Sequence, residues 1–124
     1  MRGVHVSRRR FEELVADALD SIPPELGEQM ENVAVVVEDW PTSEALEGRA
    51  GTLLGLYEGI ALTERSPLGY AGVLPDRITV FRGPLCELAR DEADLARQIR
   101  VTVVHEVAHH FGIDDQQLHD LGWA

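Results

Sequence analysis

The stretch His105–Asp115, HEVAHHFGIDD, constrains the fold of this chain more than any other part of the sequence. His105, Glu106 and His109 form the pattern H-E-x-x-H inside an otherwise apolar segment. On an α-helix, which turns about 100° and rises about 1.5 Å per residue, the two histidines lie one turn apart on one face. Burying such polar side chains without partners is costly. We therefore expect a helix with one face in the core and the other forming a polar site.

The residue types in this pattern are those that hold a catalytic zinc ion. Two imidazoles one turn apart can both reach one ion at about 2.0–2.1 Å. Glu106 borders the same face, where its carboxylate can take a proton from a water activated by that ion. The alternative is a buried helix whose polar side chains are satisfied within the core. We take His105 and His109 as candidate metal ligands and Glu106 as the candidate general base.

A third ligand is expected directly after this helix. Gly112 can adopt a positive φ and end the helix with a sharp turn, which could bring Asp115 back beneath the ion, with Asp114 as the alternative ligand. Asp114 and Gln117 also resemble a capping box that opens a short last helix, and this is compatible with Asp115 as the ligand. Two imidazoles and one carboxylate leave a fourth position for water, as in catalytic zinc sites.

Other side chains are weaker candidates for the same site. His119 lies four residues after Asp115, on the same side of the short last helix; it is either a partner of the ligands, an alternative ligand or a solvent-exposed side chain. His110 is interpreted as packing or pocket lining. Tyr57, Tyr70 and His119 are the candidates for stabilising an oxyanion.

Residues Leu53–Leu62 are predicted to form a strand in which Gly55 and Gly59 mark a bulge or a close backbone approach. An edge strand can bind an extended peptide by main-chain pairing. Leu54–Gly59, with Gly55 and Tyr57, is therefore the candidate substrate-binding segment. The alternative is structural, with glycines that permit twist and a packed tyrosine.

The remaining pattern predicts one small α/β (α+β) domain over residues 1–124, with a mixed sheet of three to four strands packed on helices. Its expected parts are a helix over Phe11–Leu19 capped by Ser7, a buried central strand over Val33–Val37, a loop over residues 64–76 that could act as a lid, a third strand over Ile78–Phe81, and an N-cap at Asp94 for the motif helix.

Composition narrows the class of partner. A net charge of −11 on 124 residues repels phosphate backbones and argues against nucleic-acid binding, whereas a peptide or protein substrate is compatible with it. No apolar run approaches the ~20 residues of a membrane helix, so no membrane association is expected. No apolar secretory segment follows the N-terminal arginines, and the single cysteine, Cys86, cannot form an internal disulfide. These features predict a cytoplasmic protein.

At His105–Asp115 the chain resembles the zincin superfamily, and the longer pattern H-E-x-x-H-x-x-G-x-x-D resembles its metzincin branch with Asp as the third ligand. The whole chain is similar to a family of small, largely actinobacterial, zincin-like metallopeptidases. This resemblance implies a minimal zincin domain in which His105, His109 and Asp115 hold one zinc ion and Glu106 is the base. The further matching stretches are Phe11–Leu19, Asn32–Glu38, Leu54–Gly59, Leu74–Arg82 and Leu118–Leu121.

One departure from the metzincin pattern concerns the methionine turn that lies beneath the metal, downstream of the zinc motif. The methionines of this sequence, Met1 and Met30, both precede the motif. The resemblance therefore extends to the ligands and the base, and not to this support.

The predicted function is zinc-dependent peptide-bond hydrolysis by a water that Glu106 activates. One alternative is a metal-dependent RNA hydrolase, because a ribosomal-RNA-maturation endonuclease family carries a related His-x3-His-x5-His arrangement in which Asp115 would take the place of the third His. Glu106 and the acidic charge argue against it. The other alternative is a non-catalytic binding module with a structural zinc, for which a closed coordination sphere is expected.

Overall fold

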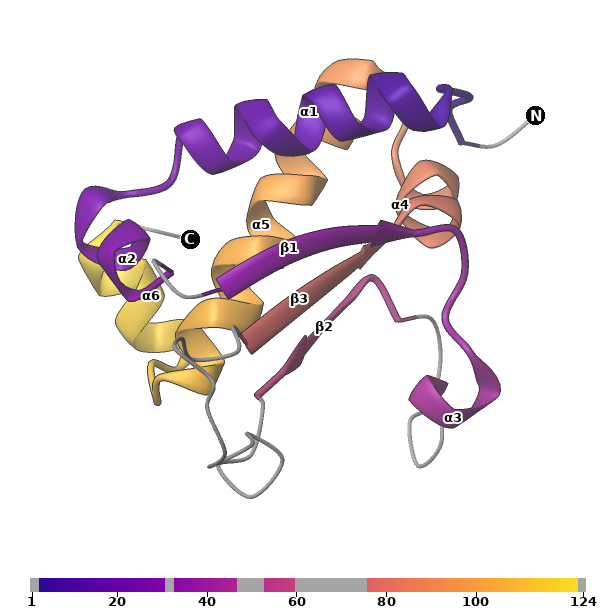
Figure 1. Ribbon diagram of the computed structural model, residues 1–124. Helices are drawn as coiled ribbons and strands as arrows, with labels where there is room; N and C mark the ends of the chain where they lie inside the picture. The colour runs from indigo at the N-terminus through magenta and orange to yellow at the C-terminus, as the bar shows by residue number, and fades with distance from the viewer. Residues whose placement is uncertain (1–2, 31–32, 47–52, 60–75, 123–124) are drawn as a thin grey trace, which may run out of the picture.

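The computed structural model describes residues 3–30, 33–46, 53–59 and 76–122. Their fold is mixed α/β, as expected: a three-stranded sheet packs on α1 and α5, with shorter helices at its ends (Figure 1). In chain order the elements are α1 (Arg8–Asp20), α2 (Pro24–Gln29), β1 (Val33–Glu38), α3 (Ser43–Leu46), β2 (Gly55–Glu58), β3 (Asp76–Phe81), α4 (Arg82–Leu88), α5 (Glu92–His110) and α6 (Asp115–Leu121).

The sheet has the order β1-β3-β2, with β1 parallel and β2 antiparallel to β3. We expected Val33–Val37 to be the central strand, and this was wrong: β1 is an edge strand of the described sheet, and β3 is central, with Ile78 and Val80 fully buried. Val33, Val35 and Val37 contact the core. β-branched residues suit a half-buried pleated surface as well as a central one, so the valine run could not distinguish the two positions.

Helix α1 follows from its cap and its apolar face. The Ser7 hydroxyl accepts a hydrogen bond from the Arg10 amide at 3.0 Å, as expected for an N-cap. Phe11, Leu14, Val15 and Ala18 are buried on the side of α1 that packs against α5. The helix ends at Asp20. Pro24 then occupies the first turn of α2, a position where proline is favoured.

Helix α5 begins one turn earlier than the sequence suggested, because its N-cap is Asp91 and not Asp94. The Asp91 carboxylate accepts from the Asp94 amide at 2.8 Å, while the Asp94 carboxylate accepts from the Arg90 amide at 3.0 Å. Asp91 thus caps the first turn, while Asp94 accepts from an amide just before the helix, and from the sequence either acid could be taken for the cap. Neither α5 nor any other helix among the described residues is long and apolar enough to span a bilayer.

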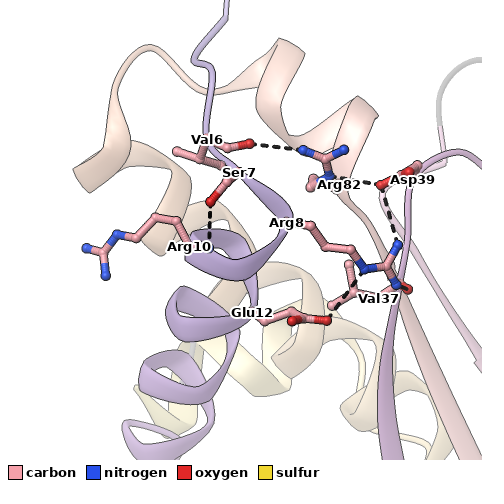
Figure 2. Close-up of polar contacts among 8 residues, drawn as sticks. All are labelled: Val6, Ser7, Arg8, Arg10, Glu12, Val37, Asp39 and Arg82. Atoms are coloured by element: carbon pink, nitrogen blue, oxygen red, sulfur yellow. Dashed lines mark hydrogen bonds and ion pairs between the residues drawn. The ribbon is translucent and has the colours of Figure 1, made fainter.

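A polar network ties the N-terminal segment to the end of the sheet where β1 and β3 finish (Figure 2). Arg82, just after β3, donates to the Val6 carbonyl at 2.9 Å and to the Asp39 carboxylate at 2.9 Å. Arg8 lies 3.7 Å from the same carboxylate and donates to the Val37 carbonyl. These arginines therefore have structural partners at this end of the molecule.

Two expectations fall on residues whose placement is outside the described ranges. The expected lid covers residues 64–76, of which Asp76 alone is described, as the start of β3. The strand expected over Leu53–Leu62 is described as β2 (Gly55–Glu58), and its last three residues lie outside.

Candidate metal centre

The two motif histidines lie on one face of α5, as the sequence predicted. The rings of His105 and His109 are nearly parallel, with a 13° interplanar angle and centroids 5.7 Å apart. The neighbouring Val104, Val107 and Ala108 are fully buried in the core. His109 is 48% exposed. The same helix therefore carries a core face and an accessible face with two imidazoles.

The chain reverses sharply after α5 because Gly112 adopts a φ of +81°. The Ile113 amide bonds the Ala108 carbonyl at 2.8 Å and the Gly112 amide bonds the His109 carbonyl at 3.1 Å. These two bonds form a Schellman motif, which favours glycine at this position. The last helix, α6, then starts with the expected capping box between Asp114 and Gln117.

This turn brings the carboxylate of Asp115 back to the motif face. Asp115 Oδ1 lies 2.9 Å from His109 Nε2, a hydrogen bond in the tautomer that carries the proton on Nε2. Asp114, the alternative ligand, instead accepts a hydrogen bond from the Gln117 amide at 2.8 Å through its carboxylate. The capping role of Asp114 is thus as the sequence predicted, and the role of Asp115 as a ligand stays a prediction.

The donor set fits a zinc ion. At Zn–N and Zn–O distances of about 2.0–2.2 Å, two tetrahedral ligands lie about 3.3 Å from each other. The 2.9 Å separation of His109 Nε2 and Asp115 Oδ1 is close to that spacing, and His105 lies parallel to His109 one turn away. Within residues 3–30, 33–46, 53–59 and 76–122, no three His, Cys, Asp or Glu side chains already surround a common point. The side chains of His105, His109 and Asp115 would therefore have to rearrange to hold an ion together.

The candidate base is held from across the site. Glu106 Oε1 accepts a hydrogen bond from the Tyr57 amide at 3.0 Å, which links α5 to β2. In the antiparallel pairing of β2 with β3, the Phe81 amide bonds the Leu54 carbonyl at 3.0 Å. Because main-chain groups alternate sides along such a strand, those of Gly55 and Tyr57 face the outer edge. The Tyr57 amide is thus an edge group of the sheet that reaches Glu106.

A cluster that the sequence did not predict surrounds the Tyr57 side chain. Its hydroxyl donates to Asp76 Oδ2 at 2.7 Å, and its ring stacks on His110 with centroids 3.9 Å apart. Partial burial and the hydrogen bond to Asp76 raise the pKa of Tyr57, so the phenol stays neutral. For His110, the sequence signal that could have indicated a place near this site is its position four residues after Glu106, on the same side of α5. Asp76 offered none, because its partner is 19 residues away.

Gly55 marks a close approach of β2 to α5. A Cβ at this position would lie 2.6 Å from Thr102 Cγ2, 3.2 Å from the Thr79 carbonyl oxygen and 3.8 Å from Glu106 Cγ. The contact supports the structural interpretation of this glycine, since a side chain would push the strand away from the helix that carries the motif. No positive φ is required here.

The remaining candidates lie apart from this geometry. His119 is exposed on α6, and its side chain makes no hydrogen bond or ion pair with any described residue. Tyr70 lies outside the described ranges. Cys86 is partly buried, and this burial raises the pKa of its thiol, which disfavours the reactive thiolate.

The chain is similar to a known protein family and to a solved structure. The profile of a family described as zincin-like metallopeptidase matches residues 30–123. The chain is also similar in structure to a conserved hypothetical protein from Thermus thermophilus, with 25% sequence identity and a TM-score of 0.54 over 85% of this chain and 94% of that one. No curated protein matches the sequence.

Proposed function

Because the chain belongs to the zincin-like metallopeptidase family, we propose that it hydrolyses peptide bonds with one zinc ion held by His105, His109 and Asp115. The observation that carries this proposal is the 2.9 Å contact of His109 Nε2 with Asp115 Oδ1, made across the Gly112 turn. It joins a residue of the H-E-x-x-H pattern to a carboxylate six positions later at nearly the spacing of two ligands. Family membership by itself indicates zinc-dependent hydrolysis in general terms.

The zinc ion, when bound, supplies Lewis acidity that polarises a carbonyl and lowers the pKa of water to about 7. The protein's own part starts with Glu106, which takes the proton of the attacking water and returns it to the leaving amine. With Oε1 engaged by the Tyr57 amide, the second carboxylate oxygen is the one that handles this proton.

Substrate would be held by the outer edge of β2. The edge carries the main-chain groups of Gly55 and the carbonyl of Tyr57 beside Glu106, which accepts from the Tyr57 amide, and an extended peptide can add to such an edge as a further strand. The segment Leu54–Gly59 is therefore the proposed substrate-binding segment. Main-chain pairing of this kind binds peptides with little dependence on their side chains. This assignment favours a peptide over RNA, as does the net charge of −11.

The test uses untagged protein loaded with zinc, its metal content measured by mass spectrometry and its cleavage of a peptide library followed by the same method. We expect one zinc per chain and cleavage that a chelator abolishes. Glu106→Gln is expected to keep the zinc and lose about 10²–10⁴-fold in rate. The matched control is Glu12→Gln, which removes an exposed carboxylate of α1 whose partner is Arg8 and should cleave as the wild type does.

Three results would overturn the proposal: no zinc bound at micromolar concentration, zinc held by four protein ligands, or RNA cleavage in preference to peptide cleavage. A closed coordination sphere seen by zinc-edge anomalous diffraction would assign the metal a structural role. Equal activity of Glu106→Gln and wild type would remove Glu106 as the base.

A further inference from the structure

The base of the proposed reaction is not oriented by its own helix. Within the described residues, the hydrogen bond to the Glu106 carboxylate comes from the Tyr57 amide on β2, 49 residues earlier in the chain. A glutamate has three rotatable side-chain bonds, so a donor placed on Oε1 selects one orientation among many. The orientation of the Glu106 carboxylate therefore depends on the place of one main-chain group on an edge strand.

That main-chain group is itself anchored through its side chain. The Tyr57 hydroxyl donates to Asp76 Oδ2 at 2.7 Å, and Asp76 is the first residue of the central strand β3. The ring of Tyr57 stacks on His110 with an interplanar angle of 19° and centroids 3.9 Å apart. Tyr57 is thus held at its hydroxyl by β3, at its ring by α5, and at its amide by the base.

In the sheet formed by the described residues, β2 has four residues and pairs with β3 on one side. Such a strand shifts more readily than a central strand. Tethering the far end of a rigid aromatic side chain to β3 limits that shift at the position where the amide meets Glu106. The side chain of Tyr57 points toward α5, where its ring stacks on His110, so the tether itself does not cover the outer main-chain edge of β2.

We propose that Tyr57 and Asp76 are positioning residues for Glu106: Asp76 holds the Tyr57 hydroxyl, and Tyr57 in turn holds the carboxylate through its amide. His110 supports the arrangement by stacking. The proposal rests on the proposed peptidase function for its catalytic consequence. The coupling of hydroxyl, amide and carboxylate is a property of the folded chain and can be measured without any activity.

The first measurement is the hydrogen-exchange rate of the amide at position 57, followed by NMR on the full chain without added metal. Glu106→Ala removes the acceptor and should accelerate this exchange roughly ten- to a hundredfold, the value of a hydrogen bond to a charged group. Tyr57→Phe and Asp76→Asn leave the acceptor in place and loosen the tether, so roughly three- to tenfold acceleration is expected. Amides of the buried half of α5 should keep their rates in all three variants.

The matched control is Glu58→Gln. It removes the exposed salt bridge between Glu58 and Arg77, 2.8 Å long, which joins the same two strands one residue further along. If acceleration at position 57 reflected general loosening of β2, this control would reproduce it. An unchanged rate in Glu106→Ala or Tyr57→Phe, or an equal acceleration in Glu58→Gln, overturns the proposal.

The second measurement uses zinc-loaded protein on a peptide found in the library screen. Tyr57→Phe is expected to lower kcat about ten- to a hundredfold, the cost of a small misplacement of a reacting group. KM and the zinc dissociation constant should stay within about twofold of wild type, because the hydroxyl contacts neither substrate edge nor proposed ligand. A fall in zinc affinity instead of kcat would overturn the positioning role. Absence of cleavage in every variant would contradict the proposed function and leave the exchange result standing.

Discussion

Replacing Gly55 by alanine tests how closely β2 must approach the motif helix. The added Cβ would lie 2.6 Å from Thr102 Cγ2, well inside van der Waals contact, and 3.2 Å from the Thr79 carbonyl oxygen. Thr102 cannot easily rotate away, since its hydroxyl donates to the Gln98 carbonyl at 2.8 Å and a β-branched side chain in a helix has few rotamers. The clash must therefore move strand and helix apart.

Overpacking of this kind costs about 1–3 kcal/mol. For a domain of 124 residues each kcal/mol corresponds to about 4 °C in Tm, so Gly55→Ala should unfold about 4–12 °C below wild type. The measurement is thermal unfolding followed by circular dichroism, with urea unfolding to give the free energy. The same separation of β2 from α5 should lengthen the contact of the Tyr57 amide with Glu106.

A second substitution identifies the atom responsible. Thr102→Ser removes Cγ2 and keeps the hydroxyl bonded to Gln98. Alone it should cost about 0.5–1.5 kcal/mol, as does loss of one buried methyl group. In that background Gly55→Ala should cost less than in the wild type, because the contact with the Thr79 carbonyl oxygen at 3.2 Å remains while the closest contact is gone. A coupling free energy of at least about 1 kcal/mol is expected from the double-mutant cycle. Additive effects, or a Gly55→Ala variant as stable as wild type, would refute the packing argument.

Three further predictions concern the two acids of the turn and the first turn of α5. Loss of a residue that only supports a metal ligand lowers metal affinity about 10–100-fold. Asp115→Ala removes a proposed ligand, so it should lower zinc affinity by more than this, as measured by competition with a chromophoric chelator. Asp114→Ala, which removes the N-cap of α6, should lower the unfolding free energy by about 1 kcal/mol, while its zinc affinity falls less than that of Asp115→Ala. The hydrogen bond from the Arg90 amide, followed by that from the Arg97 side chain, lowers the pKa of Asp94 below its usual value. Because the pKa is lower in the folded state than in the unfolded state, stability is lost as pH falls below about 4. Asp94→Asn should reduce this loss, as measured by unfolding titrations at several pH values.

Local signals in the sequence predicted the turn that precedes α6 well. Gly112 ends α5 with a positive φ and Asp114 opens α6 with a capping box, and both outcomes follow from rules that involve only neighbouring residues. The pairing of His105 with His109 on one face likewise follows from helical spacing alone. Residues whose partners lie within one turn of chain were therefore predictable.

Features that depend on residues far apart in the chain could not be predicted from the sequence. Whether β1 is an edge or a central strand depends on which strands lie beside β3. A run of valines suits both positions and therefore cannot predict which one β1 takes. The contacts of Tyr57 with Glu106 and with Asp76 join residues 49 and 19 positions apart. The expectation for the N-cap of α5 was wrong for a different reason, since Asp91 and Asp94 are both capping residue types and both accept from backbone amides at the start of the helix. The residue types alone did not distinguish the two candidate caps, and the observed start of α5 at Glu92 identifies Asp91 as the N-cap.

The proposed ligands are divided between two elements of very different robustness. His105 and His109 lie on α5, whose residues Ile99, Val103 and Val104 are fully buried in the core, so we expect this helix to be among the last parts of the domain to open. Asp115 lies on the seven-residue α6, which buries Leu118 alone among its described side chains. Such a segment can detach while the rest stays folded. How long a bound ion remains would then be decided by the detachment of α6, and release to a chelator would be fast even in a protein that resists denaturation.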